Sequence, residues 1–121
     1  GSWVVLNFFN STCVPCRQEH PLLLDFAQEQ ESSDNAVELY TIVNDDSDGP
    51  VQAFFDTNGG DWPAVRDDDG AISVAFGVAK VPESWVIDPN GFVRLRIMGA
   101  LTRGFLTSRL DELKTQFAGG Q

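Results

Sequence analysis

Cys13 and Cys16 are the only cysteines of the chain, and two residues separate them. An apolar segment of strand length, Trp3–Phe9, ends just before Cys13, and a helical pattern begins at Val14. A sulfur at the start of a helix lies beside unpaired backbone amides and the positive end of the helix dipole, which favour thiolate over thiol. Such placement lowers a cysteine pKa from about 8.5 into the range of roughly 3.5–7.5. The first sulfur is therefore a candidate nucleophile for attack on a disulfide.

Cys16 follows Cys13 by nearly one helical turn, and Pro15 between them should stiffen that turn. At this spacing Cys16 is close enough to attack a mixed disulfide on Cys13, release the partner and close a small ring. A structural disulfide and half of a metal site are the alternatives. The first would close a loop too short to constrain the unfolded chain much, and the second lacks ligands, because His20 is the only histidine. The spacing favours redox chemistry.

The elements that must position this pair alternate between strand and helix. Apolar residues spaced four apart predict a helix from Val14 to about Gln30, with a kink at Pro21 because proline lacks the amide. Val37–Val43 completes a βαβ pattern. The other predicted elements are a helix from Asp48 to about Thr57, a short strand at Trp62–Val65, a hairpin of Ser84–Asp88 and Phe92–Met98, and a last helix with Thr102 as N-cap. We expect one α/β domain over residues 1–121, a central mixed sheet flanked by helices.

Composition excludes several classes of partner. Eight Lys and Arg against 18 Asp and Glu give a net charge of −10, which repels nucleic acid and anionic lipid. No apolar run approaches the roughly 20 residues of a membrane-spanning helix, so we expect no span in this chain. Asp67–Gly70 is most simply a solvated turn, since it lacks the spacing of an EF-hand calcium loop. We predict no metal site.

Two segments together resemble a known family. Leu6-Asn-Phe-Phe-Asn-Ser-Thr-Cys13-Val-Pro-Cys16-Arg-Gln-Glu19-His-Pro21 and Gly77-Val-Ala-Lys-Val-Pro82-Glu83-Ser-Trp-Val-Ile-Asp88-Pro-Asn-Gly91 look like the thioredoxin-fold TlpA, ResA and CcmG (DsbE) group. The resemblance implies the thioredoxin fold, with a βα insertion at Asp48–Val65. It also implies a thiol-disulfide oxidoreductase outside the cytoplasm that often reduces apocytochrome c before haem attachment.

The resemblance assigns roles to individual residues. Cys13 would be the attacking thiol and Cys16 the buried resolving thiol, forming a redox-active disulfide that needs no cofactor. Pro82 matches a cis-proline that faces the cysteines and offers the backbone of Val81 to an extended substrate segment by strand addition. Thr12 stands where most relatives have Trp, so the apolar shelf for substrate beside Cys13 should be reduced, or supplied by Trp62 or Trp85.

Three further residues have two interpretations each. Glu19 matches an acidic residue of the ResA and CcmG branches, and would accept the proton of Cys16; the alternative is an exposed helix glutamate. Glu83 would add a second negative charge beside the site, or is a surface residue at a strand end. His20 would tune Cys16, or is a solvated or packed side chain. Plain thioredoxins have a buried Asp at the position of Asn7, which cannot act as a base, and this favours Glu19 as acceptor.

The resemblance also implies partners. These are a protein thiol or disulfide as substrate and a membrane electron donor of the CcdA or DsbD kind, acting on an extracytoplasmic, secreted or anchored protein that we expect to be a monomer. Two rival hypotheses stay open: an oxidant that inserts disulfides into secreted proteins, and a non-catalytic module that binds a partner or copper through its thiols.

Overall fold

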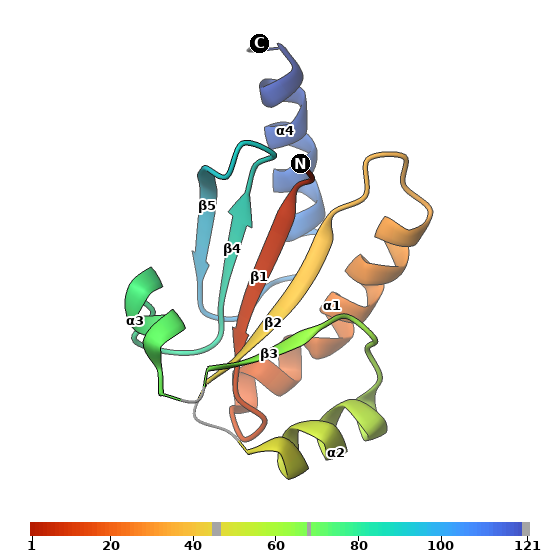
Figure 1. The fold of residues 1–121 in the computed structure, drawn as a ribbon. Helices are drawn as coiled ribbons and strands as arrows, with labels where there is room; N and C mark the ends of the chain where they lie inside the picture. Colours follow the sequence, from red (N-terminus) through yellow and green to blue (C-terminus); the bar gives the residue numbers. More distant parts are fainter. Residues whose placement is uncertain (45–46, 68, 120–121) are drawn as a thin grey trace.

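The computed structural model describes residues 1–44, 47–67 and 69–119. Its strands and helices alternate through most of the chain, as the sequence predicts (Figure 1). In chain order they are β1 (Val4–Phe9), α1 (Val14–Glu31), β2 (Glu38–Asn44), α2 (Asp48–Asn58), β3 (Ala64–Asp67), α3 (Ala71–Phe76), β4 (Glu83–Ile87), β5 (Val93–Met98) and α4 (Phe105–Gly119).

The strands form one mixed sheet in the order β3-β2-β1-β4-β5. β1 pairs in parallel with β2, which pairs in parallel with β3, whereas β1 and β4 and then β4 and β5 are antiparallel. β1 is central because its nearly continuous apolar sequence suits a strand buried on both faces. The carboxyl end of β1, the start of α1 and α2 lie together at the lower end of the view in Figure 1.

The two faces of the sheet are covered by different helices. On one face α1 and α4 enclose the main core, and on the other α3 packs near Phe8 and Ile42. Successive side chains of a strand alternate between faces, which places Asn7 in line with Val5 and Phe9 on the side of α1. The main core consists of Trp3, Val5, Leu23, Phe26, Val37, Leu39, Val86, Leu101, Leu106 and Leu110.

Helix α3 was not predicted from the sequence, because six residues are too few to show a helical period. Asp67 holds its start: the carboxylate accepts the amides of Ile72 and Ser73, both at 2.9 Å, and the Ser73 hydroxyl at 2.7 Å. Asp67 is buried, so the interpretation of Asp67–Gly70 as a solvated turn is wrong at this position, and Asp68 lies outside the described residues.

The largest differences from the predicted boundaries are at β3 and at the start of α4. β3 begins at Ala64 rather than Trp62, and the predicted Asp48–Val65 insertion forms α2 and the start of β3. α4 begins at Phe105, so Thr102 is not its N-cap; the Thr102 carbonyl instead accepts the Phe105 amide in a turn at 3.2 Å. α1 continues through Pro21 as one helix, and the kink there stays a prediction.

Candidate active site

Cys13 and Cys16 form a disulfide at the start of α1, with their Cα atoms 5.2 Å apart. Cys13 is the N-cap, and its sulfur accepts the backbone amide of Cys16 at 3.2 Å. Pro15 fits the first turn because it has no amide to leave unpaired. Cys13 is half-buried and Cys16 is only 1% exposed, so the first sulfur is the accessible one, as predicted.

The apolar surroundings of the disulfide come from residues that sequence reasoning did not single out. Phe9, Val43 and Phe54 pack with Cys16, and the half-buried Cys13 lies against the same cluster. Neither tryptophan belongs to this cluster: Trp62 packs against Phe55 and His20, and Trp85 against Phe8 and Phe76. Trp62 reaches this cluster through Phe55, which packs against it. The prediction that the shelf beside Cys13 is reduced, or is supplied by Trp62 or Trp85, stays a prediction.

The loop that faces Cys13 contains the cis peptide bond Val81–Pro82 that the resemblance implied. The carbonyl oxygen of Val81 lies 3.7 Å from the Cys13 sulfur. Beside this loop a cavity of about 410 Å³ is open to solvent and is lined mostly by apolar surface. Its lining residues are Gly77, Ala79, Lys80, Val81, Pro82, Glu83, Arg96, Met98 and Gly99.

Glu19 is 1% exposed, which makes the interpretation as an exposed helix glutamate wrong. Its two carboxylate oxygens accept the side-chain amide of Asn7 at 2.8 Å and the backbone amide of Leu101 at 2.9 Å. Burial raises the pKa of Glu19, and the hydrogen bonds from Leu101 and Asn7 oppose this rise only in part. A buried carboxyl with a raised pKa on the helix of Cys16 has the chemistry of a proton acceptor.

Sequence reasoning missed the groups that hold Glu19. Asn7 is fully buried, and its Nδ2 also donates to the Ser84 hydroxyl at 3.2 Å. Asn7 and Ser84 stand directly opposite each other on the antiparallel strands β1 and β4. Asn7, Glu19 and Ser84 lie far apart in the sequence, so no local spacing of residues predicts their contacts. Leu101 donates through its backbone amide, which the residue type does not indicate.

Neither interpretation of Glu83 agrees with the structure. The residue is buried, and its carboxylate accepts the Arg96 guanidinium in an ion pair and the Trp85 indole at 2.7 Å. Arg96 also donates to the carbonyl of Gly77 at 2.8 Å and lies over the Trp85 ring, 5.0 Å from its centroid. Glu83 therefore brings no unbalanced charge to the site, and with Arg96 it braces the segment that leads into Pro82.

Thr12 is exposed beside Cys13, and its amide and hydroxyl both donate to the side-chain oxygen of Asn10. Its contact with substrate stays a prediction. His20 is packed instead of solvated: its Nε2 donates to the Gly59 carbonyl at 2.8 Å, and its ring contacts Phe54 at a centroid distance of 4.8 Å. These contacts hold the His20 side chain against α2, and burial lowers its pKa. A role for His20 in tuning Cys16 stays a prediction.

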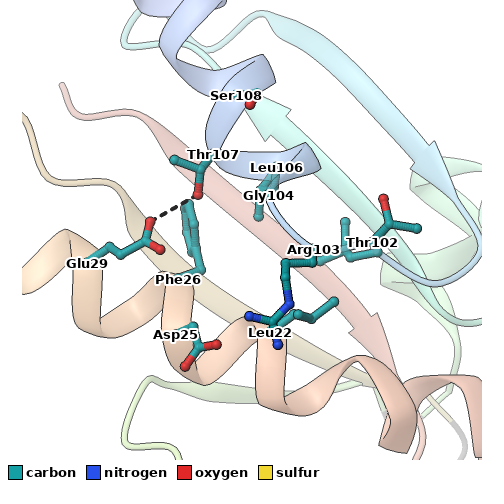
Figure 2. Close-up of a pocket in the computed structure, with 11 residues that line it drawn as sticks. Leu22, Asp25, Phe26, Glu29, Thr102, Arg103, Gly104, Leu106, Thr107 and Ser108 are labelled. Carbon is teal, nitrogen blue, oxygen red and sulfur yellow. Dashed lines mark hydrogen bonds between the residues drawn. The ribbon is translucent and has the colours of Figure 1, made fainter.

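A second cavity, of about 270 Å³, lies between α1 and the start of α4 (Figure 2). Glu29 reaches across it from α1 to accept the Thr107 hydroxyl at 3.0 Å, and Arg103 extends toward Leu22. None of the predicted site residues lines it. Within residues 1–44, 47–67 and 69–119, no group of three or more His, Cys, Asp or Glu is arranged to hold a metal ion, and no helix is long and apolar enough to cross a membrane.

A mixed sheet with a disulfide at the start of the first helix, facing a cis-proline, defines a thioredoxin-fold protein with an accessible cysteine pair. Residues 1–96 match the model of the AhpC/TSA family, and the chain belongs to that family. The solved structure of MTB DsbF, in mixed oxidised and reduced forms, superposes with a TM-score of 0.83 at 25% identity, covering 93% of this chain and 81% of that one. StoA from Bacillus subtilis superposes with a TM-score of 0.75, also at 25% identity and the same coverage.

Curated relatives carry names from thiol-disulfide chemistry. The chain is 32% identical over 114 residues to the thiol:disulfide interchange protein HelX of Rhodobacter capsulatus, covering 93% of this chain and 61% of the relative. It is 28% identical over 116 residues to the thiol-disulfide oxidoreductase ResA of Oceanobacillus iheyensis, covering 96% and 59%. The chain thus spans about three fifths of the length of these relatives.

Proposed function

We propose that this protein is an extracytoplasmic thiol-disulfide oxidoreductase that reduces protein disulfides. The observation that carries the proposal is the position of Cys13, half-buried at the start of α1 with its sulfur 3.7 Å from the Val81 carbonyl oxygen, while Cys16 is fully buried. The names of HelX and ResA support the same chemistry. The extracytoplasmic location rests on the resemblance to the TlpA, ResA and CcmG group.

The reaction begins with the dithiol form. The Cys13 thiolate attacks one sulfur of the client disulfide, which breaks that bond, joins Cys13 to the client and releases the other client sulfur as a thiolate. Cys16 gives its proton to Glu19 and attacks the Cys13 sulfur, which restores the Cys13–Cys16 disulfide and releases the second client thiolate. Two electrons pass from the dithiol to the client. An external dithiol, for which we propose a membrane donor of the CcdA or DsbD kind, reduces the protein again.

The client binds in extended form along the Val81–Pro82 loop. Hydrogen bonds to the Val81 backbone tolerate many client side chains, because strand addition reads the main chain. The neighbouring cavity, lined by Met98 and Pro82, offers an apolar surface for a side chain next to the client cysteine. Apocytochrome c is the client class that the resemblance implies, and Cys16→Ser identifies clients directly because the mixed disulfide on Cys13 then has no resolving thiol.

Glu19 supports a reductant over an oxidant. A carboxylate near a thiol disfavours the thiolate, whereas strong oxidants owe their potential to a stabilised reduced form. The test is the equilibrium reduction potential of the Cys13–Cys16 couple against glutathione or dithiothreitol. A value well below about −200 mV agrees with the proposal, and a value near −120 mV would contradict it and establish an oxidant.

A further inference from the structure

The hydrogen bonds of the Asn7 side chain are made by its nitrogen, Nδ2. Its Nδ2 donates to Glu19 and to Ser84, at 2.8 and 3.2 Å. Its Oδ1 is buried and finds no hydrogen-bond partner within the described ranges, 1–44, 47–67 and 69–119. Buried side-chain acceptors are usually satisfied, so an idle Oδ1 beside a titratable carboxyl needs an explanation.

The two hydrogen bonds to Glu19 favour its ionised form, whereas burial favours the protonated form and raises its pKa. A carboxylate accepts at both oxygens, and here each oxygen faces a donor, Asn7 Nδ2 or the Leu101 amide. When Glu19 takes up a proton, one of its oxygens becomes a donor. The Leu101 amide cannot become an acceptor, since it is part of the backbone. The Asn7 carboxamide can, because a half-turn about its Cβ–Cγ bond exchanges Nδ2 for Oδ1.

We propose that Asn7 is a positioning residue whose carboxamide turns with the protonation state of Glu19, presenting Nδ2 to the carboxylate and Oδ1 to the protonated carboxyl. The Ser84 hydroxyl fits both orientations, because it accepts from Nδ2 in one and donates to Oδ1 in the other. The proposal rests on the proposed role of Glu19 as proton acceptor, and it explains why an unpaired Oδ1 is kept in the core.

Asn7 itself exchanges no proton or electron in this scheme. The proton leaves the Cys16 thiol, resides on Glu19 while the Cys13–Cys16 bond forms, and then passes to a client thiolate or solvent. The groups that hydrogen-bond to Glu19 are Asn7 from β1, with Ser84 behind it on β4, and the Leu101 amide from the loop before α4. Cys16 lies three residues before Glu19 on α1, and both side chains are buried. The pKa of Glu19 is governed by burial and its two hydrogen bonds, with no contribution from a charged neighbour within the described part of the chain.

The test is a pH titration of the reduced protein by NMR, following the Glu19 carboxyl carbon and the Asn7 side-chain amide. The Asn7 amide protons should shift with the same midpoint as the Glu19 carbon. Their nuclear Overhauser contacts to the Ser84 β-protons should be present above that midpoint and lost below it. Asn44 is an internal control, since its Nδ2 donates to the Ser73 hydroxyl at 2.9 Å, and its contacts to Ser73 should persist throughout. Asn7–Ser84 contacts of equal strength on both sides of the midpoint would overturn the proposal.

A second variant makes the test independent of pH. Glu19→Gln places a neutral group, able to donate, opposite Asn7, and so stands in for the protonated carboxyl. Its Asn7 carboxamide should have the turned orientation at every pH, with the contacts from Nδ2 to Ser84 missing. Retention of those contacts in Glu19→Gln would contradict the turn.

Failure of the proposed function gives a different result. In Cys16→Ser the Glu19 carboxyl still titrates, so the orientation of Asn7 can be followed as before. A Glu19 midpoint that is the same with and without the Cys16 thiol would contradict proton transfer between them, whatever Asn7 does. A shifted Glu19 midpoint together with an Asn7 amide that does not rotate would support Glu19 as the proton acceptor of Cys16. That result would contradict only the rotation of Asn7.

Discussion

The backbone amide of Leu101 donates to the carboxylate of Glu19 at 2.9 Å, joining the loop before α4 to the middle of α1. Two residues earlier, the amide of Gly99 donates to the Pro82 carbonyl at 3.0 Å. One short loop therefore holds both the cis-proline that faces Cys13 and the carboxyl of Glu19, which we propose as the proton acceptor for Cys16. The two halves of the proposed reaction share this support.

Glu19→Gln should change how stability depends on pH. The pKa of Glu19 is raised in the folded protein, so the fold prefers the protonated form. Its contribution to stability is present below the ordinary value of 4.5 and is lost as the pH rises through the raised pKa. Gln stays neutral, so over this pH range the free energy of unfolding of the variant should rise relative to that of the wild type. The expected rise is about 1.4 kcal/mol for each tenfold change in the proton affinity of Glu19 on folding. Urea unfolding of both oxidised proteins from pH 4 to pH 8 measures this, and a constant difference between them would contradict it.

The contribution of His20 to stability should change with pH in the opposite direction to that of Glu19. Burial lowers its pKa below 6.5, so the unfolded chain takes up a proton that the folded protein does not bind. The stability due to neutral His20 is present above pH 6.5 and is lost as the pH falls through the lowered pKa. His20→Phe should be less stable at pH 8 by about 1 kcal/mol, because the hydrogen bond to Gly59 is lost, and should narrow this gap below pH 6. Unfolding curves with parallel pH dependence for the two proteins would refute the prediction.

Arg96→Ala should impair client reduction more than it impairs folding. Arg96 pairs with Glu83 and holds the Gly77 carbonyl, and both lie on the segment around Pro82. Displacement of that segment should lower kcat/KM for a protein disulfide by between about tenfold and a hundredfold.

Arg94→Ala is the matched control for this variant. Arg94 lies on the same strand and pairs with the buried Asp88 at 2.6 Å, away from the residues that line the cavity beside Pro82. It should lower the melting temperature and leave kcat/KM near the wild-type value. Equal losses of kcat/KM in the two variants would show that the position of the ion pair is irrelevant to client binding.

The sequence was most informative where the signal is local. The spacing of Cys13 and Cys16 after an apolar strand predicted their place at the start of a helix, and the turn after Asp88 predicted the β4–β5 hairpin. The contacts that the sequence did not predict depend on how strands far apart in the sequence pair in the sheet. Asn7 meets Ser84 across β1 and β4, and the environment of Glu83 depends on Arg96 from the facing strand.

Pairing of this kind also explains why both interpretations of Glu83 were wrong. A carboxylate at a strand end is exposed unless a cation reaches it, and no local pattern shows that Arg96 does so. The burial of Asp67 is hidden for a related reason, since it depends on the six-residue helix α3, whose Ile72 and Ser73 amides donate to the Asp67 carboxylate.

We propose that Cys13 attacks a protein disulfide and that Cys16 completes the exchange. The most direct measurement is the rate of insulin disulfide reduction with dithiothreitol as electron source, compared between the wild type and Cys16→Ser. The wild type should be faster by roughly a hundredfold or more, because without Cys16 the mixed disulfide on Cys13 is not resolved within the protein. A wild type no faster than Cys16→Ser would contradict the claim and leave a module that binds through its thiols without catalysis.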